Sequence, residues 1–149
     1  MISAYLKDNT RFADEVENWE EAIALASQPL IEKNYISPLY IEEMIENVKV
    51  NGSYIVIVPG LAMPHASSEK GVLETGIAYL NLKKPVMFPD NQEVKVLLVL
   101  AAKDSTTHLD ILSDVSSILI EDEFSDKLKE ATSEEEIMEL VETVEIYEG

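Results

Sequence analysis

The feature that most limits what this chain can fold into is the stretch 94–102, Val-Lys-Val-Leu-Leu-Val-Leu-Ala-Ala, with a single charged residue. It is the most apolar strand that the sequence predicts, and the turn signal Pro-Asp-Asn at 89–91 precedes it. Residues 54–58, Tyr-Ile-Val-Ile-Val, lack helical periodicity and favour a strand covered on both faces. Further extended segments are predicted at 75–82 and 84–88. We therefore expect an α/β fold, with a mixed, mostly apolar sheet flanked by helices on both faces.

Helical patterns alternate with these strands. Asn18 can cap a helix over residues 19–33, and Ser37 followed by Pro38 begins a second helix that ends near Asn51 and Gly52. A third helix is expected after 94–102, with His108 opening it, and a short fourth helix is expected over 123–129. Ser133 and Glu136 form a capping box for a last helix through residue 144. A length of 149 residues without repeats or linkers predicts one domain, 1–149.

Charge and composition exclude several classes of protein. Eleven basic residues against twenty-nine acidic ones give a formal net charge of −18, which repels a phosphate backbone and argues against nucleic acid as a partner. No run approaches the roughly 18 apolar residues that span a membrane, and the first residues do not resemble an export signal. There is no cysteine, so thiolate nucleophiles, disulfides and cysteine-ligated zinc are excluded. We expect a cytoplasmic protein that does not insert into membranes.

The chain has two histidines, and both follow predicted strands. His65 comes after 54–58 and a Pro/Gly break, and His108 comes after 94–102. Ligands of open α/β sheets gather at the carboxyl ends of strands, so we expect both imidazoles to face one cleft. Residues 104–107, Asp-Ser-Thr-Thr, would add hydroxyls and free backbone N–H groups at the start of a helix, an arrangement that attracts anions.

Four interpretations of these histidines are open. A histidine near a strand end is often half-buried and without a catalytic role. Two together could also form a metal pair completed by carboxylates, an acid/base pair, or a nucleophile with a supporting partner. Neither histidine has the close His/Asp/Glu spacing of a metal site. Residues 59–68 carry no charge besides His65, as a phosphoryl-accepting imidazole requires. The adjoining Leu61, Ala62 and Met63 would suit the docking of another protein, or would fill the core beneath the loop.

Residues 59–66, Pro-Gly-Leu-Ala-Met-Pro-His-Ala, resemble the active-site signature of the enzyme IIA (EIIA) components of the bacterial phosphoenolpyruvate-dependent sugar phosphotransferase system (PTS), fructose/mannitol type. Residues 71–76, 100–104 and 108–109 look like the same family, and the resemblance spans roughly 12–144. The segments 71–88 and 101–108 look most like its ascorbate-type branch. The resemblance implies a phosphotransferase that works through a phosphohistidine, with neither a metal nor an organic cofactor.

The resemblance also implies roles and partners. His65 would accept a phosphoryl group from the histidine-containing phosphocarrier protein HPr and pass it to an EIIB component, reaching the membrane permease EIIC only indirectly. His108 would be the supporting donor. Lys49 stands where the mannitol branch has an arginine, and it is either a phosphate contact or a surface residue at a helix end. The alternative is a regulatory phosphoprotein of the nitrogen-PTS or antiterminator-associated type, and a metal hydrolase using both histidines is a third hypothesis.

Overall fold

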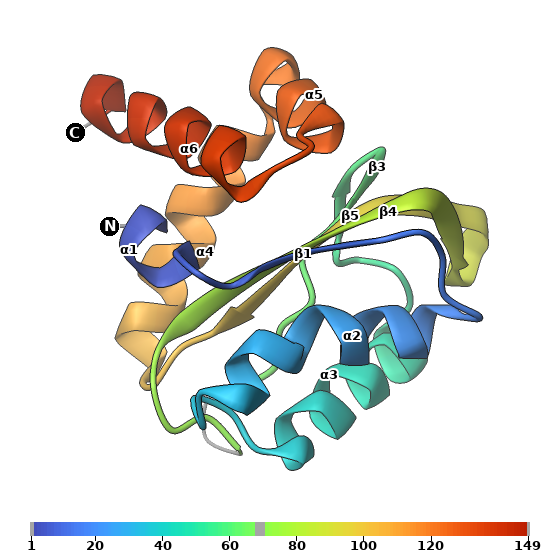
Figure 1. Cartoon of the computed structure of the whole chain (residues 1–149). Coiled ribbons are helices and arrows are strands. Elements are labelled where there is room, and N and C mark those ends of the chain that lie inside the picture. Colours follow the sequence, from blue (N-terminus) through green and yellow to red (C-terminus); the bar gives the residue numbers. More distant parts are fainter. Residues whose placement is uncertain (1, 68–70, 149) are drawn as a thin grey trace.

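A five-stranded mixed sheet separates two layers of helices (Figure 1). The computed structural model describes residues 2–67 and 71–148. Along the described chain the elements are α1 (Ile2–Leu6), β1 (Thr10–Ala13), α2 (Trp19–Glu32), α3 (Pro38–Asn51), β2 (Val56–Val58), β3 (Gly60–Ala62), β4 (Gly76–Phe88), the 3₁₀ turn η1 (Pro89–Asn91), β5 (Gln92–Ala101), α4 (Ser105–Leu119), α5 (Asp122–Glu130) and α6 (Glu134–Glu148).

The strands lie in the order β1-β4-β5-β3-β2. The long strands β4 and β5 form an antiparallel hairpin closed by η1, where Asp90 and Asn91 adopt positive φ angles of 64° and 59°. Outside this pair, β1 runs parallel to β4 and β3 runs parallel to β5, and β2 then returns antiparallel to β3 at the edge. The predicted mixed sheet is therefore confirmed.

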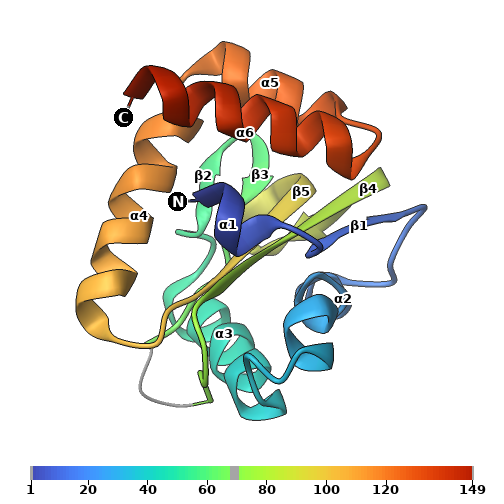
Figure 2. The ribbon, with the colours of Figure 1, turned by 60° about the vertical axis from the view of Figure 1, so that its left-hand side comes forward.

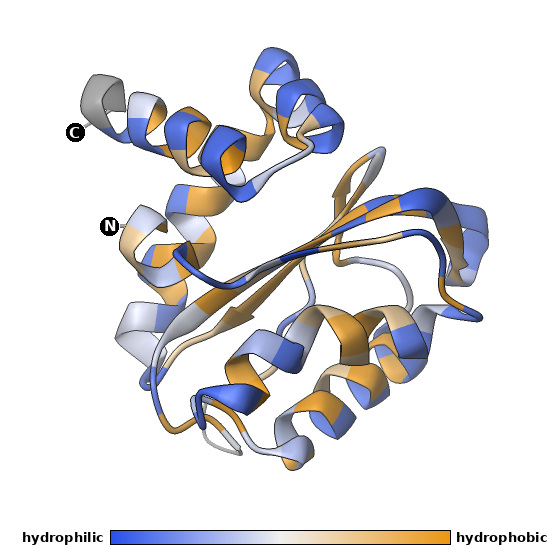
Figure 3. Ribbon diagram, viewed as in Figure 1, coloured by the Kyte–Doolittle hydropathy of each residue, from blue (hydrophilic) through white to orange (hydrophobic). Residues whose placement is uncertain are grey.

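Both faces of the sheet are buried, which explains why its strands are so apolar. Successive residues of β5 alternate between two hydrophobic cores: Leu97 and Val99 pack in the core with α2 and α3, whereas Leu98 and Leu100 pack in the core with α1 and α4–α6. Figure 2 shows these two helical layers on opposite sides of the strands, and in Figure 3 hydrophobic (orange) and hydrophilic (blue) segments alternate along the helices. In a strand that is buried on both faces, every apolar side chain is removed from water and stabilises the fold.

The helix starts follow the sequence signals. Asn18 caps α2 by accepting a hydrogen bond from Glu21 N at 2.8 Å, and Pro38 is the first residue of α3. Glu136 N donates to Ser133 Oγ at 3.2 Å at the start of α6, as a capping box requires. The Glu136 carboxylate, however, accepts from Thr132 Oγ1 at 2.7 Å instead of returning to Ser133.

Four strand and helix predictions need correction. The strand predicted at 54–58 is shorter, β2, and lies at the edge of the sheet; its side chains are only half-buried, although Val56 packs against one core and Ile57 and Val58 pack against the other. The segments 75–82 and 84–88 are one strand, β4, whose pairing with β5 shifts register between Asn81 and Val86. β3 was predicted as a break, and α1 and β1 were not predicted. His108 does not open α4, which begins at Ser105.

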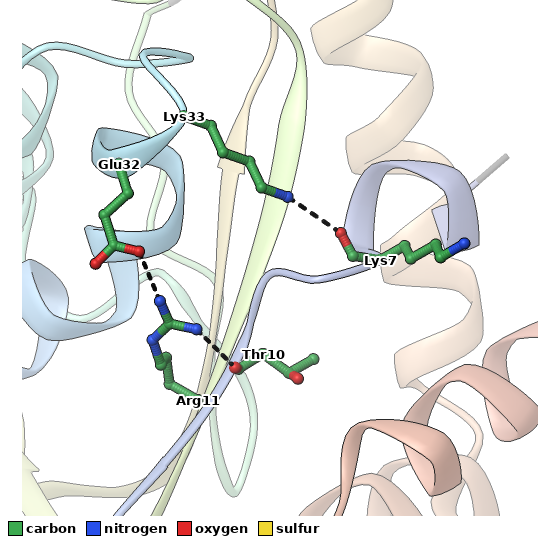
Figure 4. Close-up of polar contacts among 5 residues, drawn as sticks. All are labelled: Lys7, Thr10, Arg11, Glu32 and Lys33. Atoms are coloured by element: carbon green, nitrogen blue, oxygen red, sulfur yellow. Dashed lines mark hydrogen bonds and ion pairs between the residues drawn. The ribbon is translucent and has the colours of Figure 1, made fainter.

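Polar contacts join the N-terminal segment to the end of α2 (Figure 4). Arg11, the only arginine in the sequence, forms an ion pair with Glu32 at 2.7 Å and also donates to Thr10 O. Lys33 Nζ donates to Lys7 O at 3.4 Å. These contacts fix the edge strand β1 beside α2. Among the described helices, none has both the length and the apolar composition needed to cross a membrane.

Candidate active site

The two histidines meet at one edge of the sheet. β3 ends at Ala62, three residues before His65, and its parallel neighbour β5 ends at Ala101, shortly before α4. Because the carboxyl ends of adjacent parallel strands lie at the same edge, the segments that follow them are neighbours. His108 lies in the first turn of α4, and its ring centroid is 5.5 Å from that of His65, with the ring planes inclined by 52°. The structure thus brings together the imidazoles that the sequence predicted to share a site.

The His65 ring has a defined orientation. Its Nδ1 lies 2.7 Å from Met63 O. A carbonyl oxygen only accepts hydrogen bonds, so Nδ1 carries the proton and Nε2 carries the free lone pair in the neutral ring. The ring of Tyr54 stands nearly perpendicular to the imidazole, at 83° and with 5.8 Å between centroids. Nε2 is consequently the atom of His65 that is available as a nucleophile.

Both imidazoles have lowered pKa values. Burial lowers the pKa of His65 below its ordinary value of 6.5, although the hydrogen bond to Met63 opposes this shift. Burial also lowers the pKa of His108, and the nearby His65 lowers it further. Both rings are therefore neutral near pH 7, which is the form in which an imidazole can attack phosphorus.

Hydrogen bonds from several parts of the fold fix the main chain from Met63 to Ala66. Met63 N donates to Ile55 O at 2.8 Å, and Leu100 N donates to Pro64 O at 3.0 Å. Asn47 Nδ2 donates to His65 O at 3.3 Å, and Ala66 N donates to the Tyr40 hydroxyl at 3.1 Å. The histidine is thus carried by a segment that is bonded to β5, to α3 and to the residue preceding β2.

The charge around His65 agrees in part with the sequence prediction. Residues 59–67 contain no charged side chain besides the histidine, and residue 68 lies outside the described residues. At the start of α4, however, at least one of the N–H groups that were expected to be free is bonded to a side chain. Asp104 caps this helix by accepting from Thr107 N at 2.8 Å and from Thr107 Oγ1 at 3.1 Å, and these bonds hold its pKa below the ordinary range. A carboxylate therefore occupies the helix end that was predicted to attract an anion.

Of the two roles considered for Leu61, Ala62 and Met63, the structure confirms core filling and excludes a docking rim. All three side chains are buried in the cores, so they fill the space beneath the loop instead. The apolar side chains exposed at this edge come from other positions: Tyr54, beside His65, and Leu109, next to His108, are 47% and 66% exposed.

Lys49 lies in the last turn of α3 and is exposed. It follows Asn47 by two residues, which places it about 200° around the helix from the side chain that contacts His65 O. Within the described ranges it makes no hydrogen bond or ion pair. As for a metal, no three histidine or carboxylate side chains of the described residues are grouped closely enough to hold an ion.

Three residues of the site were missed by sequence reasoning: Tyr40, Asn47 and Tyr54. One signal was present for Asn47, because this amide lies between Met44 and Val48 on the apolar face of α3. A polar side chain on a core-facing helix stripe needs a partner there. Tyr40 and Tyr54 gave no such signal, since tyrosines are common at partly buried positions.

Comparison with known proteins agrees with this architecture. The sequence model of the family described as "Phosphoenolpyruvate-dependent sugar phosphotransferase system, EIIA 2" matches residues 5–144. The mannitol-specific cryptic phosphotransferase enzyme IIA component of Escherichia coli K12 is 37% identical over 84% of this chain and 86% of its own length. The ascorbate-specific PTS system EIIA component of the same organism is 34% identical, over 88% and 87%.

Solved structures show the same fold. The solution structure of the cryptic mannitol enzyme IIA of E. coli has a TM-score of 0.86, at 33% identity, and covers 95% of this chain and 98% of that one. A complex of enzyme IIA and phosphorylated enzyme IIB for mannitol, also from E. coli, contains a chain with a TM-score of 0.77 at 23% identity, covering 92% and 96%. The latter similarity concerns the fold alone.

Proposed function

Since this chain belongs to the type 2 EIIA family of the phosphoenolpyruvate-dependent sugar phosphotransferase system, we propose that Nε2 of His65 is the atom that carries its phosphoryl group. Members of the family are phosphotransferases that act as phosphoryl carriers through a phosphohistidine. The observation that carries the assignment is the 2.7 Å contact between His65 Nδ1 and Met63 O, which leaves Nε2 unprotonated.

The transfer balances without a metal or an added base. The nitrogen–phosphorus bond of the donor breaks, its electron pair returns to the donor nitrogen, and the lone pair of Nε2 forms the new bond to phosphorus. The His65 ring gains positive character as this bond forms, because Nδ1 keeps its proton. Met63 O accepts that proton's hydrogen bond and stabilises the developing charge. The fixed main chain from Met63 to Ala66 supplies the positioning on which in-line transfer depends.

His108 is proposed as the supporting donor. Its ring lies beside His65, at 5.5 Å between centroids, and it is half-buried. A ring nitrogen that carries a proton can donate to a phosphoryl oxygen, and the arriving negative charge favours the protonated form of the imidazole. Lys49, from its exposed position at the end of α3, stays a weaker candidate for a phosphate contact.

The proposed donor is HPr and the proposed recipient is a cognate EIIB. The recipient is supported by the E. coli mannitol complex, in which an enzyme IIA of this fold is bound to phosphorylated enzyme IIB. The cryptic mannitol and ascorbate relatives differ little in identity to this chain, 37% against 34%. We keep an ascorbate-like branch as a prediction, on the similarity of 71–88 and 101–108, and propose that the phosphoryl group serves sugar uptake.

Incubation with phosphoenolpyruvate, enzyme I and HPr, followed by intact mass, tests the proposal. We expect one acid-labile, base-stable phosphate on the wild-type chain and none on His65→Ala, and ¹⁵N chemical shifts should place it on Nε2. His108→Ala should still be labelled but should transfer the group to EIIB more slowly. Undiminished labelling of His65→Ala, or attachment at Nδ1, would refute the assignment of the carrier atom.

A further inference from the structure

One peptide unit of the active-site segment is held at both of its polar groups by the same helix. The carbonyl oxygen of His65 accepts from Asn47 Nδ2 at 3.3 Å, and the N–H of Ala66 donates to the Tyr40 hydroxyl at 3.1 Å. This C=O and this N–H belong to the single peptide bond that follows His65. Both side chains come from α3.

The spacing of the two side chains makes this possible. Tyr40 and Asn47 are seven residues apart, which is two helical turns, so they project from the same face of α3. Tyr40 is fully buried and Asn47 is half-buried on the face that packs against the sheet. The helix thus presents one acceptor and one donor, directed at the N–H and the C=O of the same peptide.

Each of the two groups is itself held in place. The Tyr40 hydroxyl donates to Leu100 O at 2.6 Å, which joins the peptide to β5, whose Leu100 N binds Pro64 O. The Asn47 amide is oriented by Asn51, whose Nδ2 donates to Asn47 Oδ1 at 3.0 Å and so leaves the Asn47 Nδ2 facing His65 O. The peptide is therefore held by two side chains that each make a second hydrogen bond.

We propose that Tyr40 and Asn47 form a peptide clamp that positions His65 for phosphoryl transfer. Fixing the 65–66 peptide fixes the backbone of His65 and thereby keeps its ring where Nδ1 reaches Met63 O. The clamp touches neither the phosphoryl group nor the ring. It acts through the backbone, so these are positioning residues, and the inference rests on the proposed function of His65.

Tyr79 provides a matched control for Tyr40. It too is fully buried, its hydroxyl donates to a backbone carbonyl, Leu128 O, at 2.6 Å, and it also accepts a hydrogen bond, from Asn81 Nδ2 at 2.8 Å. It lies in the other core, with α5. Removing either hydroxyl leaves a buried carbonyl without this partner, so both variants should lose stability; Asn81 Nδ2 also contacts Lys129 O and Ala131 O, so the loss in Tyr79→Phe should be no larger than that in Tyr40→Phe.

The experiment compares Tyr40→Phe and Tyr79→Phe, and Asn47→Ala with its exposed neighbour Glu46→Ala. Phosphorylation of each chain by phospho-HPr gives kcat and KM, and ¹⁵N shifts of the unphosphorylated protein report which ring nitrogen of His65 carries the proton. For Tyr40→Phe and Asn47→Ala we expect kcat to fall between about 10- and 100-fold with little change in KM, because misplacement affects transfer and not docking. The Nε2-protonated form of His65 should also appear.

If Tyr40 only stabilises the fold, the measurements should give a different result. If Tyr40→Phe loses stability as Tyr79→Phe does, yet keeps the wild-type kcat and ring protonation, the clamp is refuted. The two proposals also fail separately. Absence of phosphate on His65 in the wild type would overturn the proposed function, whereas the ¹⁵N measurement judges the clamp without any transfer taking place.

Discussion

Replacement of Gly71 by alanine should destabilise the fold more than the same replacement at a glycine that has a positive φ but no backbone atom close to its Cα. Gly71 has φ +87°, and a Cβ at this position would lie 2.7 Å from Tyr40 N and 2.9 Å from Ser37 Oγ. These atoms belong to the start of α3, and Ser37 N also donates to Gly71 O at 2.8 Å. A backbone nitrogen cannot rotate away, so the first turn of α3 would have to move.

Gly60 separates the two costs of such a substitution. Its φ is +84°, but a Cβ there would meet only the flexible Lys129 side chain, at 3.3 Å. The left-handed backbone costs alanine about 1–2 kcal/mol in either position. Overpacking of a well-packed contact adds about 1–3 kcal/mol, and this second term applies to Gly71→Ala alone. The entropy that alanine removes from the unfolded chain is the same for both and cancels in the difference.

Urea unfolding followed by the fluorescence of Trp19, the single tryptophan, measures both variants. We expect Gly71→Ala to lose about 1–3 kcal/mol more unfolding free energy than Gly60→Ala, with equal m-values. Equal losses in the two variants would show that the close approach of Gly71 to Tyr40 does not constrain the start of α3.

Two further results are expected. Burial holds the folded-state pKa of His65 and His108 below 6.5, so the stability that their neutral rings contribute is complete above pH 6.5 and is lost as the pH falls through the folded pKa values. NMR titration should therefore give both imidazole midpoints below pH 6.5, and the rate of His65 phosphorylation should fall with acid only below pH 6.5. A midpoint above pH 6.5 would contradict the burial argument. Asn18→Ala should cost about 1 kcal/mol in urea unfolding, because it removes the side chain that accepts from Glu21 N; an unchanged midpoint would show that this cap does not stabilise α2.

The parts of the fold that sequence could predict are those whose signals are local. Asn18 and Pro38 identify the starts of α2 and α3 because capping and proline geometry act within one turn. The three residues of β3 carry no such signal. Gly60 and two apolar neighbours become a strand only because β5 offers a partner across a wide sequence separation, which pattern reasoning along the chain does not detect.

The same distinction applies to the site. The pairing of His65 with His108 was predictable, because the rule about strand ends places both without knowledge of side-chain contacts. The peptide clamp was not. Its bonds join α3 to residues 18 and 26 positions away, and they depend on how the helix packs against the sheet. The choice between docking and core filling for Leu61 to Met63 stayed open for a related reason, because only the packing of the loop shows that these side chains turn inward, toward the cores.

The capping of α4 by Asp104 bears on how a phosphoryl group would be held. A free helix N-terminus next to His108 would bind the phosphoryl oxygens with several N–H groups. Here Thr107 N is already bonded to a carboxylate, and that carboxylate repels an anion. In the proposed function, stabilisation of a phosphoryl group on His65 would then fall mainly to His108 and to the partner protein. A carrier that binds its phosphoryl group too tightly would stabilise the ground state and slow onward transfer, since only interactions that strengthen in the transition state raise the rate.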